Sequence, residues 1–311
     1  MHVPVMLGEA LEALRIRVDG SYLDGTAGGG GHAAAIAERL GPAGRLLALD
    51  RDEAAVNRVR ERLDRWATQV QVEQANYSEM EALALRLGFA QFDGVLLDLG
   101  ISSFQLEPKR GFSFMSEAPL DMRMDRTQAL TAADLVQQLE EAALADLFWR
   151  YGEEPASRRI ARAIVAERTR APITTTGQLA ATVERAVGGR HGKLHPATRV
   201  FMALRLAVNQ ELEHLQAGLD AALRLLAPAG RLVVISFHSL EDRIVKHTLQ
   251  AHAGRWENLP AGGRRWVGTQ PTVQLVTRRP LTPTAEECER NPRARSAKLR
   301  AAEGVHTQTA S

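Results

Sequence analysis

Cysteine is almost missing from this 311-residue chain, in which Cys288 is the single example. One thiol can form neither a disulfide within the chain nor a thiolate metal cluster. Long apolar runs are missing as well, because none approaches the roughly 20 residues that a membrane span needs. The first residues also lack the pattern of a signal peptide. These absences lead us to expect a cytoplasmic protein that is not attached to a membrane.

The chain has little excess charge of either sign. Its 39 Lys and Arg residues oppose 37 Asp and Glu residues, which leaves a formal net charge of +2. This is too small to indicate a polyanionic partner. Lysine is scarce, and nearly all cations are arginines, which bind phosphate bidentately and stack on bases as an RNA-binding protein requires. A GC-rich coding bias would give the same composition, and composition alone favours that explanation.

Glycine is concentrated in one early stretch. A short apolar run at 21–24 predicts a strand, the residues 32–40 predict a helix, and consecutive glycines lie between them. Glycines without a Cβ let the backbone turn sharply and approach a ligand closely. A second apolar run ends at Asp50, about 20 residues beyond the turn, where an acid suits the ribose hydroxyls of a nucleoside. We interpret this unit as a nucleoside-cofactor site; a purely structural glycine turn is the alternative.

Two further carboxylates distinguish between nucleoside cofactors. Asp24 ends the first predicted strand and Asp98 ends another. Neighbouring carboxylates would repel the pyrophosphate of a dinucleotide but suit the sulfonium and ammonium groups of S-adenosylmethionine (SAM). Thr26 also stands where the dinucleotide pattern has its first glycine. The sequence therefore favours SAM over NAD.

Strands and helices alternate through the first hundred residues. The predicted strands are 21–24, 45–50, 70–74 and 93–98, and the predicted helices between them are 32–40, 52–65 and 78–87. This alternation predicts a doubly wound α/β sheet with parallel strands, whose ligands lie at the carboxyl ends of the strands. After Gly100 the alternation stops, and helical patterns follow at 132–138, 140–149, 156–169 and 176–187. We predict a sheet domain of 1–104 and 196–311 with an inserted helical domain at 105–195.

The sheet pattern resumes after Pro196. Apolar residues from Val200 to Leu226 recur at three- and four-residue steps and predict a long amphipathic helix that ends at Pro228. Strands are predicted at 231–237 and 273–277, with a helix at 240–250 between them. The region 256–273 shows no recognisable pattern. We expect the basic tail beyond residue 290 to be partly mobile.

Several longer motifs together resemble one family. They are Asp24 to Thr26, Gly29 to His32, Leu49 to Asp52, Leu97 to Ser103, Arg110 to Phe114, Leu120 to Asp125, Tyr151 to Glu154, His195 to Arg199, Ile235 to Arg243, and Asn291 to Ser296. The chain resembles the bacterial 16S ribosomal RNA cytosine-N4 methyltransferases of the RsmH (MraW) type. The resemblance extends over nearly the whole chain.

The resemblance implies a class I SAM-dependent methyltransferase, with a Rossmann-like doubly wound sheet and an inserted all-helical domain. It implies that the substrate is the exocyclic amine of one cytidine in the decoding centre (P-site region) of 16S rRNA, so the partner is the small ribosomal subunit. It leaves open whether the protein is a monomer or a homodimer. The SAM contacts that it implies fall on Gly30, Gly31, His32, Asp50, Tyr77, Asp98 and Gln105.

The group that accepts the proton of the cytosine amine is less clear from the sequence. Many amino methyltransferases place an Asp/Asn-Pro-Pro-aromatic motif after this strand, whereas here the strand continues as Asp98-Leu99-Gly100. Asp98 is our candidate catalytic residue, although a contact with the SAM ammonium explains it equally well. Carbonyls and hydroxyls at 101–103 are the next choice. His238, just past a strand end, is a candidate substrate contact or a histidine that merely bonds the local backbone.

Arginines provide the candidate RNA contacts. Arg158 and Arg162 fall on one helix of the insertion, and Arg199 follows it; a solvated helix face explains the same pattern. Candidate stacking partners for an unstacked cytidine are Phe112, Phe114 and Trp149.

We expect no metal site, because Gly192 and Pro196 interrupt the helix that His191 and His195 would need. No Gly-x-Ser-x-Gly elbow is present to support a hydrolase. Two rival functions stay open at this point, an NAD-dependent oxidoreductase and a non-catalytic RNA-binding assembly factor that holds SAM.

Overall fold

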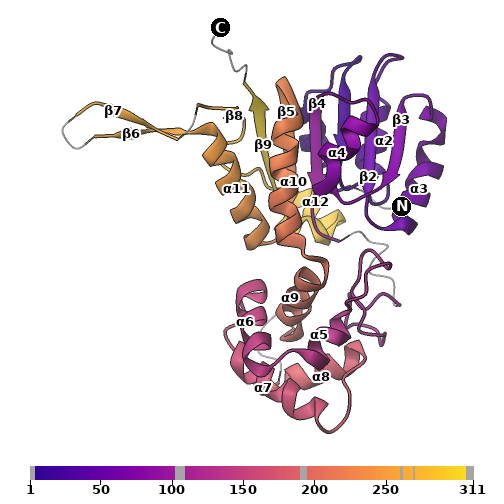
Figure 1. The fold of residues 1–311 in the computed structure, drawn as a ribbon, viewed down its shortest axis with the longest axis vertical. Helices are drawn as coiled ribbons and strands as arrows, with labels where there is room; N and C mark the ends of the chain where they lie inside the picture. The colour runs from indigo at the N-terminus through magenta and orange to yellow at the C-terminus, as the bar shows by residue number, and fades with distance from the viewer. Residues whose placement is uncertain (1–3, 102–108, 190–194, 260–261, 269, 306–311) are drawn as a thin grey trace. The chain divides into compact units, whose positions relative to one another are not determined.

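The strands of the sheet alternate their side chains between two apolar cores. The computed structural model describes residues 4–101, 109–189, 195–259, 262–268 and 270–305 (Figure 1). Leu23, Leu47 and Leu97 lie in one core, whereas their chain neighbours Leu46 and Leu96 lie in the other. Successive residues of a strand point to opposite faces, so a strand that is apolar throughout must be covered on both. The sheet is therefore enclosed between two layers of helices.

The sheet has seven strands in the order β3-β2-β1-β4-β5-β9-β8. Their bounds are β1 Ser21–Asp24, β2 Arg45–Asp50, β3 Val70–Gln74, β4 Phe92–Asp98, β5 Leu226–Ser236, β8 Val273–Leu275 and β9 Lys298–Gly304. The strands β1 to β5 pair in parallel, and β9 runs antiparallel between β5 and β8. The predicted doubly wound α/β sheet is confirmed.

Helices connect and cover these strands. They are α1 Leu7–Leu14, α2 Gly31–Ala37, α3 Glu53–Leu63, α4 Met80–Arg86, α10 Glu211–Leu225, α11 Ser239–Ala253 and α12 Ala285–Arg290, with the 3₁₀ turns η1 Asp64–Trp66, η2 Tyr77–Glu79 and η3 Pro292–Ser296. Within the described ranges, no helix combines the length and apolar character that a membrane span requires.

The chain divides into two compact units. The first comprises 1–100 with 212–311 and holds the sheet, and we call it the sheet unit; the second, 101–211, is the helical unit. The helical unit contains α5 Ala132–Gln138, α6 Glu141–Gly152, α7 Ser157–Arg168, α8 Thr176–Val187 and α9 Ala197–Asn209, which surround a core of their own. Capping boxes begin α5 at Thr131 and α8 at Thr175.

The prediction of one long helix from Val200 to Leu226 is wrong, because the structure has two helices that are separated at Gln210. This residue takes a left-handed φ of 48° and separates α9 from α10. Asn209, just before the break, donates from Nδ2 to the Met122 carbonyl and accepts from Met124 N, each at 2.8 Å. These bonds hold α9 in the helical unit. The second boundary of that unit thus lies at 211, whereas the sequence placed it at 195.

The C-terminal region also differs from expectation. The basic stretch from Lys298 is not a mobile tail but strand β9, in which Leu299 and Ala301 are buried while Lys298 and Arg300 bond Asp242. The region without a recognisable pattern forms the hairpin of β6 (Arg255–Asn258) and β7 (Arg264–Val267). The strand expected at 273–277 is β8, which ends at Leu275.

Candidate cofactor and active site

Three carboxylates lie at the carboxyl ends of adjacent strands. Asp24, Asp50 and Asp98 end β1, β2 and β4, and the sheet order β2-β1-β4 places Asp24 between the other two. Asp24 pairs in register with Ala48 on one side and Leu96 on the other, so all three strands end at the same edge. The expected acidic edge is present.

The glycine turn lies at this edge. Gly28 and Gly30 have φ values of 53° and 73°, in the left-handed region that glycine adopts without strain. Gly30 is the N-cap of α2, and Gly31, its first residue, lies so close to Pro4 that a Cβ there would overlap the proline ring. The sequence therefore needs glycine at these positions to bring the backbone around the strand ends.

Asp50 is already engaged by the backbone of the turn. Its Oδ2 accepts from Gly28 N and its Oδ1 from Asp52 N, both at 2.8 Å. Burial nevertheless raises the pKa of Asp50 to about 6. Each carboxylate oxygen keeps a second lone pair that can accept from a ribose hydroxyl.

Asp24 and Asp98 are the two carboxyls of the site that burial makes most costly to ionise. Burial, with a smaller contribution from the Asp50 charge, raises the pKa of Asp24 to about 7. Burial, followed by the charges of Asp24 and Glu241, raises the pKa of Asp98 well above its usual value. Among the described residues, Asp24 Oδ2 and Asp98 Oδ1 are buried without a hydrogen-bond partner. Buried carboxylate oxygens without partners fit a cationic ligand and disfavour an anionic one.

His32 connects the glycine turn to Asp98. The side chain is buried in α2, with Nδ1 3.5 Å from Asp98 Oδ2 and Nε2 3.2 Å from the carbonyl oxygen of Val5. The helix that follows the turn thus places an imidazole against the candidate catalytic carboxylate.

The end of β5 brings a second histidine to the same edge. Leu99 N donates to the Ile235 carbonyl at 2.9 Å, so the ends of β4 and β5 lie side by side. His238 is the N-cap of α11, where its Nδ1 accepts from Glu241 N at 3.4 Å and its Nε2 lies 3.2 Å from Glu241 Oε1. His238 therefore bonds the local backbone through Nδ1, at the same edge of the sheet as Asp98.

Glu241 is a residue that the sequence prediction missed. Its side chain is 3% exposed, and its Oε2 accepts from Phe237 N at 2.8 Å. An acid three residues after an N-cap is the signature of a capping box, and this signal was available in the sequence. The negative charge of Glu241 contributes to the raised pKa of Asp98.

Tyr77 lies in a space that two glycines leave open. It begins η2, next to the end of β3. A Cβ on Gly25 would lie 3.0 Å from Tyr77 Cβ, and one on Gly218 of α10 would lie 2.7 Å from Tyr77 Cε2. The ring is partly buried and belongs to the sheet unit with the other predicted cofactor residues.

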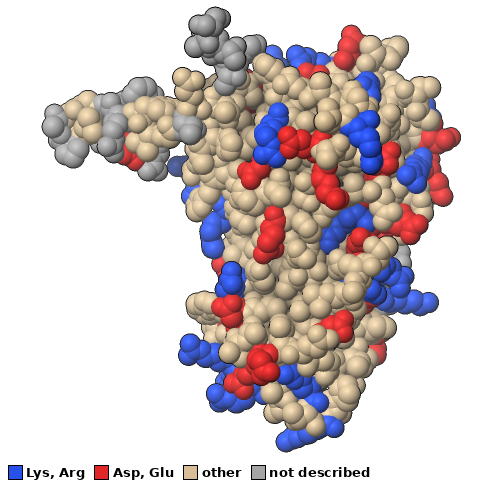
Figure 2. All heavy atoms as spheres, in the orientation of Figure 1, with Lys and Arg blue, Asp and Glu red and all other residues tan. Residues whose placement is uncertain are grey.

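The predicted RNA contacts of the helical unit are exposed arginines. Arg158 is exposed on α7. The Arg162 side chain is 76% exposed with Nε 3.5 Å from Glu141, and Arg199 Nη1 lies 3.9 Å from Glu154. Figure 2 shows cations and anions interspersed on the face in view. Both ion pairs are long, and Arg162 and Arg199 remain exposed.

The candidate stacking aromatics differ in accessibility. Phe112 is in the core of the helical unit, and the Phe114 ring packs 4.5 Å from that of His195 and 5.0 Å from that of Phe201. Trp149 is 59% exposed. Of the three, Trp149 is the one that the helical unit leaves open to a base.

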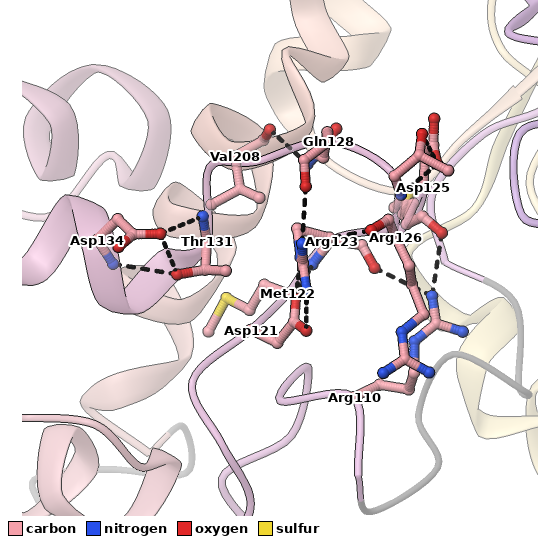
Figure 3. Close-up of polar contacts among 12 residues, drawn as sticks. Arg110, Asp121, Met122, Arg123, Asp125, Arg126, Gln128, Thr131, Asp134 and Val208 are labelled. Atoms are coloured by element: carbon pink, nitrogen blue, oxygen red, sulfur yellow. Dashed lines mark hydrogen bonds and ion pairs between the residues drawn. The ribbon is translucent and has the colours of Figure 1, made fainter.

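The Leu120 to Asp125 motif forms a rigid loop in the helical unit. Arg123 donates from Nε and Nη2 to the two carboxylate oxygens of Asp121 and from Nη1 to the carbonyls of Arg126 and Gln128 (Figure 3). Arg110 donates from Nη2 to two carbonyls of the same loop. The motif is therefore used mainly to fix its own backbone.

Some of the expected residues lie outside the described part of the chain. These are Gln105, the residues 102–103 and His191. His195 is described, and its Nδ1 accepts from Ala197 N while its Nε2 lies 3.6 Å from Glu184. Within the described ranges, no group of three or more His, Cys, Asp or Glu side chains could hold a metal ion.

The sheet order with its antiparallel β9, the glycine turn and the acidic strand ends define a class I SAM-dependent methyltransferase, and SAM is its methyl donor. The sequence profile of the MraW methylase family matches residues 1–305, and the chain belongs to this family.

Relatives of similar length support the assignment. Ribosomal RNA small subunit methyltransferase H of Thermomicrobium roseum is 52% identical over 305 residues, which are 98% of this chain and 94% of the relative. The proteins of the same name from Dehalococcoides mccartyi and Cyanothece sp. are each 48% identical, over 98% and 97% of this chain and over 86% and 94% of their own lengths.

Proposed function

We propose that the protein transfers a methyl group from SAM to the exocyclic N4 of one cytidine in the decoding centre of 16S rRNA. The observation that carries this proposal is the pair of buried, unpartnered carboxylate oxygens on Asp24 and Asp98 at the carboxyl edge of the sheet. The name of the relatives, ribosomal RNA small subunit methyltransferase H, supports the RNA class, and the motifs that resemble the cytosine-N4 family support the acceptor atom.

In this proposal the cofactor is bound by residues at the strand ends and in the turns that follow them. Gly30 and Gly31 let the turn approach the donor closely, and Asp50 accepts from the ribose hydroxyls. Tyr77 packs against the adenine. Asp24 Oδ2 and Asp98 Oδ1 bind the ammonium group, which leaves Asp98 Oδ2, beside His32, to accept a proton. His32 and Gln105 complete the family's set, and Gln105 lies outside the described residues. Bound SAM supplies an electrophilic methyl group on a sulfonium.

Asp98 and His32 handle the proton that the amine must lose. The cytosine amine is a weak nucleophile because its lone pair is delocalised into the ring, so an acceptor for its N–H bonds assists the attack. The amine takes the methyl group from the sulfonium, which becomes a thioether, and the nitrogen loses one proton to the carboxylate of Asp98. The Nδ1 of His32, 3.5 Å away, stabilises the protonated acid.

Each unit contributes its own proposed contacts to the RNA. In this proposal Arg158, Arg162 and Arg199 bind phosphates of the rRNA, and the helical unit recognises the RNA around the target. His238, at the end of β5 beside Asp98, contacts the cytidine. The phosphate contacts are sequence-independent, so base recognition depends on the strand-end residues.

The experiment is methyl transfer to purified small subunits that lack the modification. The enzyme and labelled SAM are incubated with these subunits, and nucleosides from digested rRNA are identified by mass spectrometry. We expect N4-methylcytidine at one position. SAM binding without any methylated nucleoside would indicate an assembly factor, and binding of NAD in place of SAM would indicate an oxidoreductase.

A further inference from the structure

Positive charge is concentrated in one segment of the sheet unit. The residues 243–280 contain seven Lys and Arg residues and one acidic residue, Glu257, and therefore carry a net charge of +6. The chain has 39 Lys and Arg against 37 Asp and Glu, so the other 273 residues hold 32 against 36 and are net negative by four. A local excess of this size within a nearly neutral chain marks a contact surface for a polyanion.

The fold exposes four of these seven cations among the side chains that the structure describes. On α11, Arg243, Lys246 and His247 are exposed at i, i+3 and i+4, which places them on one face, while Val245 and Leu249 are buried on the other. The remaining cations lie in the hairpin β6–β7 and after β8, where Arg278 and Arg279 are exposed. We call the segment 243–280 the basic arm.

Acidic groups beside the basic arm are already engaged. Glu241 is buried against His238, and Asp242 accepts from Lys298 Nζ at 3.1 Å and from Arg300 Nε at 2.7 Å. Within the described residues, Lys246, Arg278 and Arg279 form no ion pair. The positive charges of these three residues are thus not paired within the described part of the chain.

The hairpin extends this surface beyond the sheet. Figure 1 shows β6 and β7 projecting from the end of α11, past β8. The two ends of the hairpin meet, because a Cβ on Gly268 would lie 3.1 Å from Gly254 Cα, and the Trp266 ring covers Gly254. A two-stranded ribbon without a core adds little stability to a fold. The ribbon contains three arginines and one acid, a composition that suits contact with a polyanion.

We propose that the basic arm binds the phosphate backbone of the RNA substrate and forms an RNA surface on the sheet unit, in addition to the arginines proposed on the helical unit. The inference rests on the proposed function, since it takes RNA to be the substrate. Six of the seven cations are arginines, whose planar guanidinium groups bind phosphate oxygens bidentately. Contacts of this type position RNA without reading its bases.

Two variants test the basic arm. One joins Gly254 directly to Gly268 and so removes 255–267, and the other is R278Q/R279Q. The matched control is R65Q/R86Q, which removes two exposed arginines elsewhere in the sheet unit. The affinity of each protein for a transcribed 16S rRNA fragment is measured from low to high salt, and SAM affinity is measured alongside.

We expect both arm variants to bind the RNA several-fold more weakly at low salt, with a shallower salt dependence. Each lost phosphate contact lowers the slope of log affinity against log salt by about 0.7 to 0.9. The control and the SAM affinities should match those of the unaltered protein. If the excision fails to fold, as judged by its thermal transition, R278Q/R279Q decides the question.

Unchanged RNA affinity and salt slope in the folded arm variants would overturn the proposal. Equal loss of affinity for a duplex DNA of the same length, with no preference of the unaltered protein for RNA, would overturn the RNA assignment. The result is separable from the proposed function, because RNA binding is measured without methylation. If the unaltered enzyme methylates small subunits and the arm variants bind RNA normally, the proposed role of the basic arm is wrong and the proposed function stands.

Discussion

His32 Nδ1 lies 3.5 Å from Asp98 Oδ2, while Nε2 of the same ring lies 3.2 Å from the carbonyl oxygen of Val5. A carbonyl can only accept, so Nε2 carries the hydrogen. In the neutral form of the ring, Nδ1 then presents its lone pair to Asp98 and favours the protonated acid, in the same direction as the burial that raises the pKa of this acid.

The first prediction concerns this pair. His32→Ala removes the acceptor, so the pKa of Asp98 should fall and the acid side of the pH–rate profile should move to lower pH. Glu12→Ala, an exposed acid on α1, serves as the control. A shift to higher pH after His32→Ala would show that the ring is cationic and would contradict this arrangement.

The second prediction concerns Asp50. Asp50→Ala removes the acceptor for the ribose hydroxyls and should weaken SAM binding by about 1–3 kcal/mol, or roughly 5- to 150-fold. Calorimetric titration measures the affinity. Asp64→Ala, an exposed acid in η1, should bind SAM normally. Unchanged affinity in the Asp50 variant would remove this residue from the site.

The third prediction is a pH dependence of cofactor binding. Burial raises the pKa of Asp24 to about 7 and that of Asp50 to about 6, so both carboxyls are largely protonated at pH 5. A cationic ligand favours the ionised forms. The affinity for SAM should therefore fall as the pH drops through 7 and 6, and binding near pH 6 should release protons. Titrations in buffers of different ionisation enthalpy measure this release, and an affinity that rises on acidification would contradict it.

The fourth prediction uses a pair of glycines. Gly218→Ala in α10 places a Cβ 2.7 Å from Tyr77 Cε2 and must displace the ring, so SAM affinity should fall. In Gly8→Ala of α1 the new Cβ meets no atom within 4 Å, so this variant should keep SAM affinity and gain up to about 1 kcal/mol of helix stability. Equal SAM affinity in both variants would show that Tyr77 does not contact the cofactor.

The sequence predicted the first half of the fold well because local patterns determine it. Apolar runs that alternate with amphipathic helices predict β1 to β4, and the acids at the ends of three of these runs predict the edge of the sheet where a ligand binds. The break at Gln210 was missed because the apolar spacing continues through it, and only the tertiary bonds of Asn209 fix the left-handed turn. Strand β9 was missed because its exposed positions are charged, and their partner Asp242 lies 56 residues before Lys298 in the chain.

Local patterns also predicted the acids of the site, but they did not predict the contacts that depend on tertiary structure. Asp24, Asp50 and Asp98 could be placed together because parallel strands end at one edge of the sheet. The contact of His32 with Asp98 and the buried charge of Glu241 depend on helix positions that no local pattern gives.

The most direct measurement is a crystal structure of the protein with SAM bound. The account predicts the ammonium group within hydrogen-bond distance of Asp98 Oδ1 or Asp24 Oδ2, with the ribose hydroxyls on Asp50. A donor bound away from these strand ends, or with its ammonium group turned away from both acids, would contradict it.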